Sequence, residues 1–176
     1  MKTAILLLLC FSLLSCRREA EPTAPAPQPI TSDQQLFTLI TRDQPFAGYG
    51  LFPNADSVVS GTLNGSSAHQ PEVRVLMNST AIRALPGGLP QEGLSFPDGS
   101  VILKEVRTGG VASLYAVLYK EVDNPLAGGG WLWAEFRPDG AVVFSIERRG
   151  AGCISCHSRE DGPRYDHVRT FERQNP

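Results

Sequence analysis

The pattern of apolar and polar positions predicts a short helix at the start of the domain. Thr31–Asp33 has the residue types of a helix N-cap, and apolar side chains recur at helical spacing between residues 36 and 40. Pro45 prevents much continuation of that helix. The Gly, Asn and Ser content of residues 46–70 indicates loops, and a second short helix is predicted within residues 78–85.

The remainder of the chain has the pattern of β structure. Pro97-Asp98-Gly99 and Pro138-Asp139-Gly140 are turn signals, because Pro presets φ, Asp bonds its own backbone and Gly accepts the left-handed conformation. The second turn predicts a hairpin between the strands that contain Trp131 and Phe144. We therefore expect an α+β fold, with a mostly antiparallel β-sheet and a few short helices. The predicted strands are Glu72–Met77, Val101–Arg107, Ala112–Val122, Trp131–Phe136 and Val142–Glu147.

The beginning of the chain has the features of an export signal. Lys2 precedes an apolar run, residues 4–14, that is too short to span a bilayer as a helix. The run ends in Leu-Leu-Ser-Cys at Cys16, which resembles the bacterial lipobox, so we expect residues 1–15 to be a lipoprotein signal peptide and Cys16 to be lipidated. Ordinary cleavage near Ser15, which would leave Cys16 free, is the alternative.

The signal is followed by a linker and one domain. Residues 16–30 would form the lipid anchor and a linker rich in Pro and Ala, a composition that favours extended polyproline II conformation. Residues 31–176 have the length of a single domain. The expected location is outside the cytoplasm, with the protein anchored to a bacterial membrane by lipid alone, on its periplasmic or cell-surface side.

Charge and cysteine content narrow the possible functions. A net charge of -2 without a long run of one sign gives no basis for binding nucleic acid. Of the 4 cysteines, Cys10 is removed with the signal and Cys16 carries lipid, so no disulfide framework is expected. The cysteines that remain, Cys153 and Cys156, lie in one motif.

That motif, Cys153-Ile154-Ser155-Cys156-His157, is the attachment pattern of haem c, on a predicted helix or loop near the C-terminus. The two thiols would add to the haem vinyl groups, and His157 would be the proximal iron ligand. The second ring nitrogen of such a ligand usually donates to a carbonyl or carboxylate, which fixes the tautomer. Covalent attachment of haem occurs outside the cytoplasm, in agreement with the export signal.

Other chemistries for the same residues remain open. A thioredoxin-type dithiol would need a βαβ setting, which the surrounding pattern lacks. A zinc site could be completed by His167, although the spacing is shorter than in finger-like sites. A sixth haem ligand from Met77, His69 or His167 would make an electron carrier, but we expect Met77 to pack in the core and the distal iron site to be open.

The haem motif and two upstream segments resemble the cytochrome P-460 family. These segments are Phe96–Glu105, with the sequence FPDGSVILKE, and Gly130-Trp131, and both precede the motif in the family's order. The resemblance covers about residues 72–171. It implies a mostly antiparallel sheet, one covalent haem c, a five-coordinate iron with an open distal face, and a homodimer.

The resemblance also implies candidate site residues and three possible functions. Lys104 matches a lysine that is bonded to the haem macrocycle in family members that oxidise hydroxylamine, and Glu160 or Asp161 matches their acidic residue over the iron. Such a protein is a haem-dependent oxidoreductase that acts on a small nitrogen compound. Related beta-type cytochromes c′ lack the lysine bond and bind nitric oxide or another diatomic gas. Transfer of electrons to a redox partner cytochrome is the third possibility.

Strand alternation leaves the orientation of Lys104 open. Lys104 shares a strand face with Ile102 and Val106, whereas Glu105 shares the other face with further apolar residues. Because both faces are apolar, periodicity does not decide which one is core, and a solvent-facing lysine is the alternative. Trp131 and Trp133 share one strand face and are candidates for the wall of a haem pocket. Asp166-His167-Val168 resembles the closing Asp-x-Val segment of the family, a structural cap.

Overall fold

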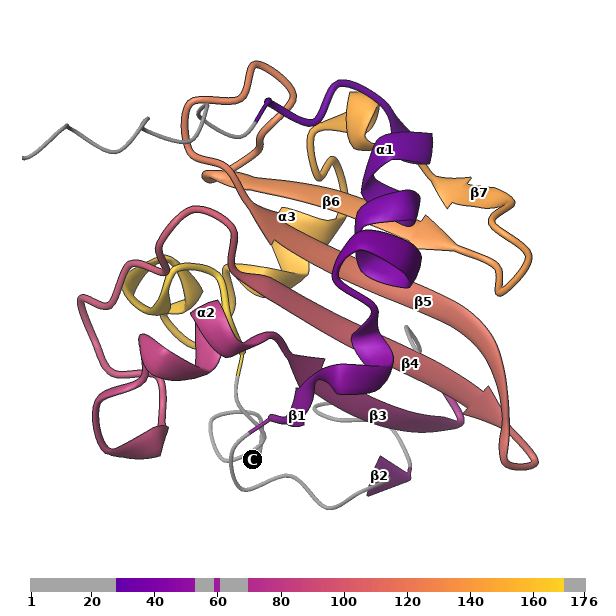
Figure 1. Ribbon diagram of the computed structural model, residues 1–176. Helices are drawn as coiled ribbons and strands as arrows, with labels where there is room; N and C mark the ends of the chain where they lie inside the picture. The colour runs from indigo at the N-terminus through magenta and orange to yellow at the C-terminus, as the bar shows by residue number, and fades with distance from the viewer. Residues whose placement is uncertain (1–27, 53–58, 61–69, 170–176) are drawn as a thin grey trace, which may run out of the picture.

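The computed structural model describes residues 28–52, 59–60 and 70–169 and shows an antiparallel sheet at the centre of the protein (Figure 1). The strands are hydrogen-bonded in the order β1-β3-β4-β5-β6-β7, and β2 also pairs with β3. The sheet and its few short helices confirm the α+β expectation. The strands are β1 (Gly50–Leu51), β2 (Val59–Ser60), β3 (Glu72–Met77), β4 (Val101–Thr108), β5 (Val111–Lys120), β6 (Trp131–Phe136) and β7 (Val142–Phe144).

The helical segments are short, and their caps follow the sequence. The Ser32 hydroxyl accepts a hydrogen bond from the Gln35 N–H at the start of α1, at 3.3 Å. The Asn78 side chain does the same for the Ala81 N–H at the start of α2, at 3.0 Å. The segments are α1 (Asp33–Thr38), a π-helical turn (Leu39–Asp43), α2 (Ser79–Arg83), α3 (Cys153–His157), and 3-10 turns at Phe46–Gly48, Pro86–Gly88, Ile146–Arg148 and Gly162–Tyr165.

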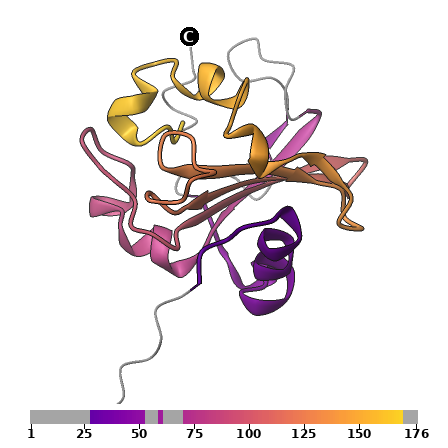
Figure 2. The same ribbon diagram turned by 90° about the horizontal axis from the view of Figure 1, so that it is seen from above.

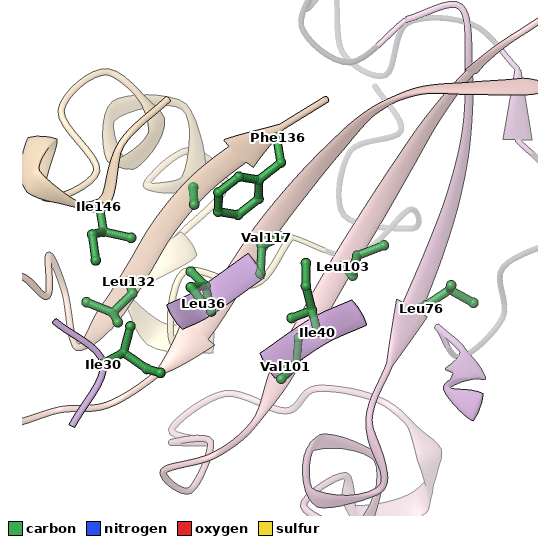
Figure 3. Packing of buried hydrophobic residues seen from close by; sticks show 11 residues of the cluster. Ile30, Leu36, Ile40, Leu76, Val101, Leu103, Val117, Leu132, Phe136 and Ile146 are labelled. Carbon is green, nitrogen blue, oxygen red and sulfur yellow. The ribbon is translucent and has the colours of Figure 1, made fainter. Parts of the chain in front are cut away.

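One face of the sheet packs against α1. Leu36 and Ile40 from the helical segment are fully buried against β4, β5 and β6 (Figure 3). Burial of such side chains is the main stabilising contribution in a domain of this size. The sheet residues of this cluster are Leu76, Val101, Leu103, Val117, Leu132, Ala134 and Phe136.

The opposite face of the sheet is covered by the C-terminal part of the chain. Viewed along the edge of the sheet, α1 (indigo) lies on one side and the segment that contains α3 (yellow) lies on the other (Figure 2). Val168, near the end of the described chain, is buried in a cluster with Trp131, Trp133 and Phe144 of the sheet. The sheet therefore has apolar side chains on both faces, and α3 lies over the second one.

The end of β7 differs from the prediction that a strand runs to Glu147. The strand ends at Phe144, and a 3-10 turn begins at Ile146. The Ser145 hydroxyl accepts a hydrogen bond from the Glu147 N–H at 3.2 Å, and Asp33 accepts from the Ile146 N–H at 2.9 Å. These two side chains, one local and one from the start of α1, satisfy backbone N–H groups that a longer strand would have paired with β6.

Candidate functional site

The residues of the predicted haem motif form one short helix, α3. Gly150 and Gly152 precede it with φ of 71° and 91°, a conformation that glycine adopts without strain and that turns the chain into the helix. Because side chains three and four positions apart lie on the same helix face, Cys153, Cys156 and His157 project to one side. The intervening Ser155 is exposed, and its hydroxyl donates to the Gly152 carbonyl at 2.8 Å.

The imidazole of His157 is held by the backbone. Its Nδ1 lies 2.9 Å from the carbonyl oxygen of His167. A carbonyl can only accept a hydrogen bond, so in the neutral ring Nδ1 carries the proton and Nε2 is the nitrogen without one. This arrangement is the one that orients histidine ligands in metal sites, and it leaves Nε2 as the atom able to bind a metal.

Trp133 packs against the same imidazole. The ring centroids of Trp133 and His157 are 4.9 Å apart, with an angle of 78° between the planes. The indole N–H donates to the Gly128 carbonyl at 2.8 Å, and a Cβ atom on Gly150 would lie only 2.6 Å from the indole Cδ1. Trp133 is therefore fixed by its neighbours and restricts the movement of His157.

A hollow lies between α3 and the sheet. The empty space there is about 260 Å³ when the part that is open to solvent is included. Its sheet side includes Ala116, whose small side chain leaves space between the longer side chains on either side of it in the sheet. The bordering residues are Ala116, Val117, Leu118, Trp133, Ala134, Glu135, Phe144, Cys153 and His157.

Two ionisable side chains flank Ala116 across the sheet. Lys104 of β4 pairs in register with Ala116 of β5, which pairs with Glu135 of β6, so all three share the face that α3 covers. Burial, and after it the nearby Arg169 cation, lowers the pKa of Lys104 to about 8, although Cys156 and Glu135 oppose this change. A lysine with such a pKa is a neutral, nucleophilic amine in about one molecule in ten at pH 7.

The opposite face of the same strand contains Glu105. Its carboxylate lies 2.7 Å from Arg74 and 3.1 Å from Arg107, on the side of the sheet that faces α1. The structure thus settles the orientation that alternation left open, because Lys104 is partly buried on the α3 side.

The two thiols are free and partly buried. Burial raises the pKa of the Cys153 thiol, and the charge of Glu135 raises it further. Thioredoxin-type dithiols need a thiol with a lowered pKa, so this environment opposes the dithiol alternative. The Cys156 sulfur accepts a hydrogen bond from the Arg169 guanidinium at 3.3 Å.

The acidic residues that the family resemblance pointed to lie beside α3 but do not border the hollow. Glu160 accepts a hydrogen bond from Arg169 Nε at 2.8 Å, and the same carboxylate oxygen lies 2.6 Å from Nη2 in an ion pair. Asp161 is exposed and precedes the 3-10 turn of residues 162–165. Of the carboxylates in the described ranges, the one that borders the hollow is Glu135.

Sequence reasoning missed Glu135 although a signal was present. In β6, Trp131, Trp133 and Glu135 occupy alternate positions, so they point to the same face of the sheet. A carboxylate that follows two large aromatic residues on one strand face is unusual for a core strand. This alternation alone therefore predicts that Glu135 lies next to Trp131 and Trp133 on the same face of the sheet.

A zinc site and a sixth haem ligand receive no support from the geometry. Over residues 28–52, 59–60 and 70–169, no three His, Cys, Asp or Glu side chains form a metal-binding group. The ring of His167 packs against Gly129, where a Cβ atom would lie 2.7 Å from Nε2, and its carbonyl, not its ring, faces His157. Met77 is fully buried and does not border the hollow, as expected for a core residue.

Several predictions concern residues outside the described ranges, namely the signal peptide of residues 1–15, the lipidated Cys16 and the loop residue His69. None of the helices that the structure describes has the length and apolar character needed to cross a membrane.

No protein-family model matches this chain, and the search of curated proteins gives no match.

Proposed function

We propose that this chain is a c-type haem protein with an iron site that is open to a small nitrogen compound. Cys153 and Cys156 carry the thioether bonds, and His157 is the proximal ligand. The observation that carries the proposal is the hydrogen bond from His157 Nδ1 to a carbonyl, on the same helical turn as two free thiols. That combination presents the sulfur atoms and a ligating Nε2 on one side of α3.

The residues present fit this cofactor. The donors comprise two thiols and a neutral imidazole, and the hollow beside them has mostly apolar walls that include Trp133 and Phe144. The hollow is small and partly open to solvent, so the described residues would cover only one edge of a flat macrocycle. Attachment through two covalent bonds does not require complete enclosure.

The proposed reaction is oxidation of hydroxylamine or a similar small nitrogen compound. Haem supplies an iron that accepts electrons from the substrate and passes them to an external one-electron acceptor, such as a partner cytochrome. Oxidation of hydroxylamine to nitric oxide releases one proton for each electron removed. Glu135 is the carboxylate that borders the hollow, so we assign it the role of proton acceptor, with Glu160 and Asp161 as the earlier candidates.

Lys104 supports the catalytic form of the proposal. Its amine is on the sheet face under α3, and burial keeps its pKa near 8. A neutral amine in that position is a nucleophile, as the bond to the macrocycle that the family resemblance implies would require. Forming that bond would replace one hydrogen of the ring and one of the amine and remove two electrons, which an external oxidant such as a peroxide would accept. Without that bond, the same open site would bind nitric oxide or another diatomic gas and perform no oxidation.

Absorption spectroscopy of the purified protein tests these alternatives. In a host equipped for cytochrome maturation, a shifted, broad ferrous Soret band is expected for the lysine adduct, and Lys104→Ala should restore an ordinary haem c spectrum. Ordinary high-spin spectra in the wild type would support the gas-binding form. Low-spin spectra would indicate a sixth protein ligand and contradict the open site.

Steady-state oxidation of hydroxylamine with a soluble electron acceptor tests the carboxylates. Glu135→Gln should lower kcat by about 100-fold or more, because it removes the proton acceptor and preserves side-chain volume. Asp161→Asn is the matched control at an exposed position and should leave kcat unchanged. If Glu135→Gln were fully active and kcat fell strongly in Asp161→Asn or Glu160→Gln, the proton acceptor would instead be a carboxylate of the loop after α3.

We also propose export and lipid anchoring at Cys16, followed by a linker that ends before Ile30, because Ile30 is buried in the core of the domain. The lipobox-like sequence before Cys16 supports this. In a bacterial host, the wild type should sediment with membranes and incorporate radiolabelled palmitate, and Cys16→Ser should do neither. The proposed homodimer is tested by sedimentation velocity of the anchor-free domain.

A further inference from the structure

A buried ion pair lies at the end of β5, beneath the segment that closes the site. Lys120 Nζ lies 2.6 Å from Asp166 Oδ1, and the exposed fractions of the two side chains are 3% and 10%. A buried ion pair often stabilises a fold no more than apolar residues of the same volume would, because both charges lose their hydration. Its presence therefore calls for an explanation other than stability.

Asp166 is held from three directions. Besides the contact with Lys120, its second carboxylate oxygen accepts the Phe96 N–H at 2.8 Å. Its backbone carbonyl accepts the indole N–H of Trp131 at 2.8 Å, and the Lys120 ammonium lies 4.9 Å from the centre of that indole ring. Side chain and backbone of Asp166 are thus fixed to the sheet.

The next residue carries the carbonyl that binds His157. Asp166 and His167 both adopt left-handed backbone conformations, with φ of 54° and 62°. Non-glycine residues adopt this conformation only where surrounding contacts impose it. The His167 N–H donates to the Gly162 carbonyl at 2.8 Å, and the His167 carbonyl accepts from His157 Nδ1 at 2.9 Å. The position of that carbonyl therefore depends on the contacts of Asp166.

We propose that the Lys120–Asp166 ion pair is a positioning device for His157. By fixing Asp166, the pair holds the His167 carbonyl against Nδ1 and keeps the proton on that nitrogen, so that Nε2 remains the unprotonated nitrogen of the neutral ring. Neither Lys120 nor Asp166 touches the reacting atoms; both act through the backbone of residue 167. The part of this inference that concerns iron rests on the proposed haem site, whereas the tautomer of His157 does not.

The test is a double variant, Lys120→Met with Asp166→Asn, which removes both charges and keeps the approximate volumes. In the haem-free full-length protein, ring nitrogen NMR at a pH where His157 is neutral should show the Nδ1–H tautomer in the wild type and a mixture in the variant. In the ferrous haem protein, the Fe–His stretching frequency in resonance Raman spectra should fall, because loss of donation from Nδ1 weakens the ligand as a base.

Arg164→Gln is the matched control. It breaks the exposed Arg164–Glu92 ion pair, which also ties the loop after α3 to the rest of the domain. Tautomer and Fe–His frequency should both be unchanged in that variant. If the double variant does not fold, Asp166→Asn alone, which retains an acceptor for the Phe96 N–H, should produce a smaller change in the same direction.

The outcomes separate this inference from the haem proposal. An unchanged tautomer and an unchanged Fe–His frequency in a folded variant would overturn the positioning role. If the wild type carries no haem but the tautomer responds as described, the positioning role stands and the haem proposal fails.

Discussion

The indole of Trp133 meets the imidazole of His157 edge to face, with ring centroids 4.9 Å apart and planes at 78°. Edge-to-face contacts between rings are attractive and directional. The hydrogen bond from Nδ1 to the His167 carbonyl fixes one point of the imidazole, and Trp133 limits rotation about that point. His157 is therefore oriented before any ligand binds.

The contact between Gly150 and Trp133 predicts the effect of adding one methyl group. In Gly150→Ala, the strain at φ 71° is accompanied by a clash with the fixed indole, so we expect a loss of about 2 to 4 kcal/mol in unfolding free energy. Gly87→Ala has a similar φ of 66° with no atom within 4 Å, and should cost about 1 kcal/mol. Denaturant unfolding measures both. Equal losses in the two variants would show that Trp133 is free to move.

The lowered pKa of Lys104 predicts a pH-dependent stability. The pKa is about 8 in the folded protein and 10.5 in the unfolded chain, so the unfolded chain binds more protons between these values and stability rises with pH across that window. Below pH 8, Lys104 is charged in both states, and the folded protein bears the full cost of burying the ammonium group. In the haem-free protein, Lys104→Met should therefore be more stable than wild type by about 2 to 3 kcal/mol at pH 7, and by nearly nothing above pH 10.5. A difference that stays constant with pH would contradict this interpretation.

The charge of Glu135 predicts a change in the titration of Cys153. Burial is the main cause of the raised pKa of this thiol, and Glu135 is the second. In haem-free Cys156→Ser protein, adding Glu135→Gln should lower the pKa of Cys153 while leaving it above the ordinary thiol value. The rate of alkylation by iodoacetamide as a function of pH measures the shift. If the pKa of Cys153 did not change, the Glu135 carboxylate would have to lie too far from the thiol for both to border the same hollow.

The buried cap of α2 predicts a large stability effect at Asn78. Its side-chain oxygen accepts hydrogen bonds from the Ala81 and Val101 N–H groups at 3.0 and 3.1 Å, and its amide donates to the Gly99 carbonyl at 2.8 Å. Asn78→Ala should cost about 2 to 4 kcal/mol, because buried partners lose their bonds. Ser32→Ala, at the exposed cap of α1, should cost about 1 kcal/mol. Similar losses in thermal unfolding would contradict the linking role of Asn78 between α2 and β4.

Periodicity and turn chemistry predicted much of the sheet. The strands Glu72–Met77 and Trp131–Phe136 match the predicted bounds, because their alternation and flanking residues are clear. The hairpin at residues 137–141 also forms as expected. Strands β1 and β2 were expected to be loop, since two residues are too few to show any alternation.

The arrangement of the site was harder to predict from the sequence than the sheet was. Lys104 lies in a strand with apolar residues on both faces, so its orientation depends on which face α3 covers. Lys120 and Asp166 are 46 positions apart, and no local pattern links them. The motif of residues 153–157, by contrast, is local, so the sequence alone identified the two thiols and the imidazole as one group, and the structure adds that α3 presents them on one side.

The most direct test of the central claim is the intact mass and absorption spectrum of the mature protein from a host equipped for cytochrome maturation. We expect one covalent haem per chain, and we expect it to be lost in a Cys153→Ser, Cys156→Ser double variant. A colourless wild-type protein, in which Cys153 and Cys156 both titrate as free thiols, would contradict it.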